Sequence, residues 1–169
     1  RYGADITLIE DNGLGGSAVI DDCVPSKSFI AGANVKTDLR RAEDMGLSMK
    51  LSEDAAEPGA TRLVTALNGR VRQLAGKQSN DISRSVERAG VRIVAGRGTF
   101  DDYNLNQTVH YIRVEHTDGT VETIECDLVL VATGASPRIL PGAWPDGERI
   151  VTWRQIYNIT ELPEHLIVV

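Results

Sequence analysis

Cysteine is scarce in this chain of 169 residues, which contains only Cys23 and Cys126. Two cysteines so far apart do not form the closely spaced framework of a small secreted, disulfide-stapled domain. The sequence therefore favours a reducing compartment, and we expect a cytoplasmic location.

Long apolar runs and a strong net charge are missing as well. No segment approaches the roughly 20 apolar residues that a membrane-spanning helix needs, so no membrane span is expected. The formal net charge of −6 is modest and negative, which argues against a nucleic-acid partner. With 41% hydrophobic residues, the chain has enough apolar side chains for one domain with a core.

The first half of the chain predicts one strand and two helices. Residues 4–10 are rich in β-branched side chains and end in a turn, which indicates a strand. A helical pattern follows over 25–46, with its proline in the first turn, where the missing N–H costs nothing. After a polar loop at 52–59, apolar residues at helical spacing predict a long helix over 60–89.

The second half predicts mainly strands. Short strands are expected at 91–95 and 98–100, and Asp118-Gly119 predicts a hairpin between strands at 109–115 and 121–125.

The continuous apolar run 128–132 is typical of a strand buried on both faces. A proline-punctuated linker, a short helix at 153–159 and a final strand at 166–169 complete the prediction. This order favours an α/β dinucleotide-binding layer with an inserted antiparallel β-meander.

A segment around Cys23 carries the most specific pattern in the chain. It reads Gly15-Gly16-Ser17-Ala18, four residues, and then Cys23-Val-Pro-Ser-Lys27. This resembles the redox-site signature of the flavin-dependent pyridine-nucleotide disulfide oxidoreductases, which include dihydrolipoamide dehydrogenase. Their signature has a first cysteine where this chain has Ala18.

The missing first cysteine bears directly on the predicted activity. A disulfide needs two sulfurs whose β-carbons come within about 4.5 Å, and this motif offers one. The family branch without the first cysteine consists of NAD(P)H:quinone reductases, so the resemblance implies hydride transfer from NAD(P)H through FAD to a quinone. Two alternatives stay open: a dihydrolipoamide dehydrogenase-type disulfide reductase with a cysteine from outside this chain, or a flavin-binding fragment with no turnover of its own.

The resemblance also implies catalytic positions. Cys23 inherits a contact between its sulfur and the flavin, and Lys27 lies near the flavin as a cation. Asp21 and Asp22 depart from the family pattern; they either oppose a thiolate at Cys23 or cap the following helix. Cys126 is expected to be a small core side chain.

Further cofactor-binding positions lie before the cysteine motif. Glu10 ends the first predicted strand, where an acid can accept hydrogen bonds from a ribose; a solvated turn residue is the alternative. Asp11 is implied beside it. The spacing of Gly13, Gly15 and Ala18 matches a Rossmann turn, but Pro25 would break the helix which that turn requires. We therefore interpret 13–18 as a loop that approaches a pyrophosphate; a plain turn is the alternative. Within it, Gly15, Gly16 and Ser17 are cofactor-binding candidates.

The remaining candidates follow the meander. The run that ends at Thr133-Gly134-Ala135 resembles the family strand that brings backbone to the cofactor, and Gly98 resembles its adenine contact. The three histidines, at 110, 116 and 165, have no metal-ligand spacing, so no metal is expected.

The resemblance covers nearly the whole chain and implies a truncated, three-layer FAD-binding domain of the glutathione-reductase type. Residues 1–150 are assigned to this domain, without its first strand and glycine turn. Residues 151–169 are assigned to a linker and the first strand of an NAD(P)-binding domain. A homodimer, formed through a missing C-terminal domain, is also implied.

Overall fold

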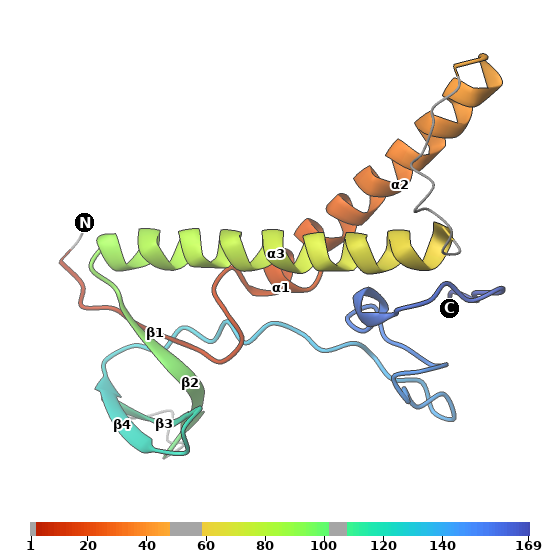
Figure 1. Cartoon of the computed structure of the whole chain (residues 1–169). Helices are drawn as coiled ribbons and strands as arrows, with labels where there is room; N and C mark the ends of the chain where they lie inside the picture. The colour runs from red at the N-terminus through yellow and green to blue at the C-terminus, as the bar shows by residue number, and fades with distance from the viewer. Residues whose placement is uncertain (1–2, 48–58, 102–107) are drawn as a thin grey trace. The chain divides into compact units, whose positions relative to one another are not determined.

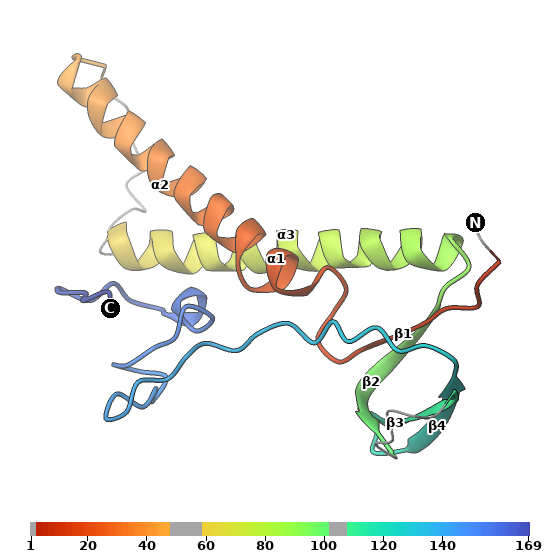
Figure 2. The same cartoon turned by 180° about the vertical axis from the view of Figure 1, so that it is seen from behind.

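The computed structural model describes residues 3–47, 59–101 and 108–169 (Figures 1 and 2). The chain forms two compact units. The first contains residues 1–16 and 78–135, and the second contains residues 17–77 and 136–169.

The first unit is built on a four-stranded sheet in the order β1-β2-β3-β4. Its strands are β1 (Thr7–Glu10), β2 (Arg92–Phe100), β3 (His110–His116) and β4 (Val121–Cys126). β1 pairs with β2 in parallel, whereas β2–β3 and β3–β4 are antiparallel. The meander and its hairpin are therefore confirmed.

β2 is one continuous strand of nine residues, so the prediction of two short strands was wrong. Its first part, up to Ala95, pairs with β1, and its second part, from Gly96, pairs with β3. A β-carbon on Gly96 would lie 2.6 Å from the carbonyl oxygen of Glu115. Glycine stands there because another backbone passes too closely for a side chain, and not because the strand breaks.

The core of this unit is a small apolar cluster between the strands. Val94, Ile112 and Val114 are buried, and Val114 is fully so. Burial alternates along β3, as expected for a strand with one face toward a core. Partly buried apolar side chains from β1, β4 and the following segment pack against this cluster: Ile9, Ile124, Cys126 and Val129.

Helices dominate the second unit. They are the short α1 (Gly16–Ile20), α2 (Cys23–Asp44) and most of α3 (Gly59–Arg88), whose last turns belong to the first unit. The predicted bounds of both long helices are confirmed to within two residues. The beginning of α2 crosses α3, and α2 then diverges from α3 toward its own last residue, Asp44 (Figures 1 and 2). At this approach, a β-carbon on Gly32 would collide with the side chain of Leu67.

Two predicted strands are absent from the part of the chain that the structure describes. The run 128–132 is not in a strand, and its Leu128 and Leu130 side chains are 84% and 86% exposed. The run 166–169 is likewise not in a strand, and its side chains are exposed. An apolar run becomes a buried strand only when neighbours pair with its edges, and no described residue does so here.

The linker helix is also shorter than predicted. Only η2 (Ile156–Asn158), a 3-10 turn, forms within 153–159. The loop predicted at 52–59 lies outside the described residues except for Gly59, which begins α3. Neither long helix, over its described length, has an apolar stretch sufficient to cross a bilayer.

The two kinds of glycine environment allow a matched stability test. We expect Gly96→Ala to lower the free energy of unfolding by about 1–3 kcal/mol, because the new methyl group meets backbone that cannot rotate away. Gly76→Ala is the control: the position lies on α3 with open space around it, so the change should be neutral or stabilising by up to about 1 kcal/mol. Urea unfolding of both variants measures this. Equal stabilities would contradict the close approach at Gly96.

Candidate functional site

Glu10 ends β1 and holds the turn that follows it. One carboxylate oxygen, Oε1, accepts hydrogen bonds from the backbone N–H groups of Asn12 (2.9 Å) and Gly13 (3.3 Å). Gly13 has a φ of 129°, which favours glycine. The other oxygen, Oε2, has no hydrogen-bond partner within the described residues. The predicted ribose acid is therefore oriented by its own turn and keeps one oxygen available for a ligand.

The glycine segment is partly helical, which differs from the predicted loop. Gly15 and Gly16 have positive φ angles of 104° and 57°, and Gly16 begins α1. α1 includes Ala18 and ends at Ile20. Because α1 ends before Pro25, which lies in the separate helix α2, the proline does not interrupt it. Glycine is needed at positions 15 and 16, since only glycine adopts such φ angles readily.

Cys23 and Lys27 lie one turn apart at the beginning of α2, and both are exposed. Cys23 is the first residue of the helix rather than the residue before it. Its thiol is free, and Ala18 supplies no sulfur. The side-chain cap expected from Asp22 is absent: the residue occupies the N-cap position, but its carboxylate makes no capping bond.

Asp21 has a different role from the predicted cap. Its carboxylate forms an ion pair with Arg154 at 3.4 Å, and the Asp21 side chain is 20% exposed. Arg154 also lies over the ring of Trp153, 5.1 Å from its centre. The acidic residue that departs from the family pattern thus joins the α1–α2 corner to the segment near η2.

Two further contacts hold the same segment. Tyr157 packs edge-on against Phe29 of α2 at 6.2 Å between ring centres, and burial raises the pKa of its phenol against the effect of a hydrogen bond with Ser26. Asn68 of α3 donates a hydrogen bond to the carbonyl oxygen of Ile159 at 2.8 Å. Sequence reasoning missed Arg154 and Tyr157; the only signal for them was an acidic pair without an evident basic partner.

The remaining predicted positions lie in the first unit. Gly98 is in β2, where a β-carbon would lie 3.3 Å from the side chains of both Ile9 and Ile112, so the position has little room for a side chain. Glu10 itself pairs with Ala95, three residues before Gly98 along β2. Thr133, Gly134 and Ala135 are exposed, and Gly134 has a φ of 70° with open space around it.

Cys126 is a partly buried member of the β-meander, as predicted. Its thiol lies 3.7 Å from the carbonyl oxygen of His110, and its side chain packs against the core cluster. Burial, with the nearby charges of Asp127 and Glu125, raises the pKa of the thiol. In the described residues, no group of three or more His, Cys, Asp or Glu side chains is arranged to hold a metal ion.

The whole chain, residues 1–169, matches the family described as pyridine nucleotide-disulphide oxidoreductase. The chain therefore belongs to this family, and the resemblance seen in its motifs is confirmed.

Individual relatives extend the comparison. The chain is 47% identical over 164 residues to a Mycobacterium tuberculosis protein named NAD(P)H dehydrogenase (quinone), covering 97% of this chain and 32% of that protein. A dihydrolipoyl dehydrogenase from Chlorobaculum parvum is 29% identical over 170 residues, covering 100% of this chain and 33% of the relative. The chain spans about a third of the length of these curated relatives.

A solved structure shows the same fold. The crystal structure of LpdA from Mycobacterium tuberculosis superposes with a TM-score of 0.80 at 45% sequence identity, covering 97% of this chain and 33% of that one. The predicted fold class, an α/β FAD-binding domain of this family with an antiparallel meander, is confirmed.

The two thiols should differ sharply in reactivity. We expect a maleimide at pH 7 to label Cys23 quickly because it is exposed, and Cys126 slowly because it is partly buried with a raised pKa. Since a raised pKa lowers the thiolate fraction at neutral pH, labelling of Cys126 should increase as the pH becomes more alkaline. Peptide mapping by mass spectrometry measures both rates, with Cys23→Ser and Cys126→Ser as controls. Faster labelling of Cys126 at pH 7 would contradict the described environments.

Proposed function

We propose that the full-length protein containing this chain is a flavoprotein that uses NAD(P)H to reduce a quinone, without a redox-active disulfide. The observation that carries the proposal is Ala18 in α1, which leaves the free, exposed Cys23 without a partner sulfur in its own motif. The relative at 47% identity, named NAD(P)H dehydrogenase (quinone), supports the same activity. The dihydrolipoyl dehydrogenases are more distant.

The donor set of this chain fits FAD. Glu10 offers an oriented carboxylate oxygen for a ribose hydroxyl. Gly15 and Gly16 have positive φ angles, and the open space at Gly16 would let a pyrophosphate approach the backbone. When bound, FAD would supply the hydride chemistry. The other positions proposed to hold it are Asp11, Ser17, Gly98, Thr133, Gly134 and Ala135.

Lys27 and Cys23 are proposed to act on the redox half of the cofactor. The ammonium group of Lys27 is a positive charge that could stabilise negative charge developing on the flavin, and the sulfur of Cys23 would lie beside the ring system.

The remaining assignments concern the full-length protein. Residues 1–150 are proposed to belong to the FAD-binding domain, and 151–169 to the linker and start of an NAD(P)-binding domain. A homodimer and a cytoplasmic location are also proposed. The location is supported by the fact that both cysteines are unpaired.

The function is tested on the purified full-length protein. We expect a flavin absorbance spectrum, FAD released on denaturation, and oxidation of NAD(P)H with menadione as acceptor. Lipoamide and glutathione disulfide should be reduced far more slowly, because Ala18 cannot exchange disulfides. A colourless protein that releases no FAD would exclude the proposal, while lipoamide turnover equal to that of menadione would favour a disulfide reductase with a cysteine outside this chain.

The roles of Cys23 and Lys27 should separate in variants. Cys23→Ser should keep most menadione turnover and change the flavin spectrum, since the thiol is not needed as an electron carrier. Lys27→Ala should lower the rate of flavin reduction roughly a hundredfold, as expected on removal of one preorganised charge. Lys36→Ala, also on α2 but more than two turns further along, is the matched control and should behave like wild type. Stopped-flow measurement decides between them. Loss of menadione turnover in Cys23→Ser with FAD still bound would place the thiol in the pathway.

A further inference from the structure

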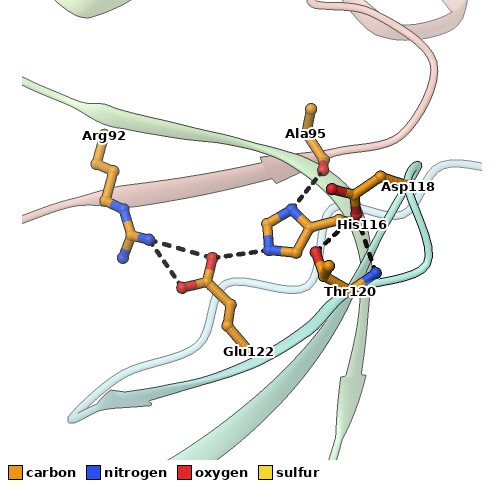
Figure 3. A network of polar contacts seen from close by, with 6 residues as sticks. All are labelled: Arg92, Ala95, His116, Asp118, Thr120 and Glu122. Atoms are coloured by element: carbon orange, nitrogen blue, oxygen red, sulfur yellow. Dashed lines mark hydrogen bonds and ion pairs between the residues drawn. The ribbon is translucent and has the colours of Figure 1, made fainter.

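A chain of polar contacts crosses the meander and ends on β2, as Figure 3 shows. It begins at His116, the last residue of β3, whose Nδ1 lies 3.1 Å from the carbonyl oxygen of Ala95. A carbonyl oxygen only accepts hydrogen bonds, so Nδ1 donates. The other ring nitrogen, Nε2, lies 3.3 Å from the Glu122 carboxylate of β4. Arg92 contacts both oxygens of that carboxylate, at 3.1 and 2.9 Å.

The hairpin after His116 holds this residue in place. The carbonyl oxygen of His116 accepts a hydrogen bond from the N–H of Gly119, and its own N–H donates to Thr120. Asp118 accepts hydrogen bonds from the backbone N–H and the hydroxyl of Thr120, which lower the pKa of its carboxyl. The His116 side chain is 27% exposed, so its contacts are partly shielded from water. The hairpin therefore fixes the backbone of His116, while the contacts of its two ring nitrogens hold the imidazole.

The contact falls at an informative position. Ala95 is the register partner of Glu10 in the β1–β2 pair, and it is the last residue of β2 that pairs with β1. The next residue, Gly96, pairs with His116 itself. His116 therefore holds the carbonyl at the point where β2 leaves the strand that carries Glu10.

We propose that His116 is a positioning residue for Glu10. By holding the Ala95 carbonyl, it sets where the end of β1, and with it the turn that orients the Glu10 carboxylate, lies relative to the adenosine ribose. This rests on the proposed function, since Glu10 binds a ribose only if the protein holds FAD. The Glu10 turn is held by its two internal hydrogen bonds, by the buried side chain of Leu14 and by the β1–β2 pair. Its angle depends on where β2 turns away, and His116 sets that point through Ala95.

Two conservative replacements of His116 can separate its contact with Ala95 from its contact with Glu122. The amide nitrogen of asparagine can occupy the place of the histidine Nδ1, whereas that of glutamine reaches the place of Nε2. His116→Asn therefore keeps the bond to Ala95 and loses the one to Glu122. His116→Gln does the reverse. If the Ala95 carbonyl is what matters, only the asparagine restores function.

The experiment measures recognition of the ribose hydroxyl rather than turnover. ADP and 2′-deoxy-ADP compete with FAD for the full-length apoprotein, followed by flavin fluorescence, which restricts the readout to the flavin site. In wild type, ADP should compete about tenfold better than 2′-deoxy-ADP, as expected for one hydrogen bond to a carboxylate. In His116→Ala this ratio should fall toward one. His116→Asn should restore it, and His116→Gln should not.

Controls separate this proposal from general destabilisation. Arg113→Gln removes a more distant ion pair with Glu115 on the same strand, at 3.8 Å, and should leave the ratio unchanged. Glu10→Gln should lower the ratio directly. If His116→Ala does not fold, the Asn and Gln variants decide: equal ratios for the two would overturn the proposal.

The outcomes also separate it from the proposed function. Wild-type protein that binds no FAD would refute both. Wild-type protein that binds FAD and prefers ADP, with the same preference kept in His116→Ala, would refute the positioning role alone. FAD binding with no preference for ADP in wild type would show that Glu10 does not read the ribose hydroxyl, and the role of His116 would fall with it.

Discussion

The change of partner within β2 is the constraint on which the first unit depends. The strand pairs with β1 up to Ala95 and with β3 from Gly96 onward. This is possible only because Gly96 lets the backbone of Glu115 approach to 2.6 Å of where a β-carbon would be. The parallel pair carries Glu10 and its turn, and the antiparallel part carries Gly98. One strand thereby joins the predicted ribose acid to the meander, and the contact from His116 lies at the junction.

In the second unit, the corner that carries Cys23 is joined to a distant part of the chain. Arg154 pairs with Asp21, Tyr157 packs on Phe29, and Ile159 accepts a hydrogen bond from Asn68. A partly exposed ion pair contributes only about 1 kcal/mol or less, so these contacts matter for where the corner is held more than for overall stability. A disulfide within the motif would restrain this corner covalently; here the neighbouring Asp21 is restrained by an ion pair instead.

Local patterns predicted the elements that local physics decides. Apolar residues at helical spacing placed both long helices, and Asp118-Gly119 placed the hairpin. The failures have a common cause. Residues distant in sequence decide all three: the continuity of β2, the exposure of 128–132 and the pairing of Asp21. The periodicity of a segment carries no information about such distant partners. Gly96 is the clearest case, because a residue that usually interrupts a strand is required here by a neighbouring strand.

The candidate site divides along the same line. The sequence by itself determined that the motif has a single sulfur, because position 18 is alanine, whatever the fold. It also determined the order of Glu10, the glycine segment, Cys23 and Lys27, from which the family follows. Only the tertiary structure decided that Glu10 accepts hydrogen bonds from its own turn, that Asp21 pairs with Arg154, and that His116 holds Ala95. Composition and spacing determine which groups exist, but hydrogen bonds depend on distances of a few ångström between residues that only the folded backbone brings together.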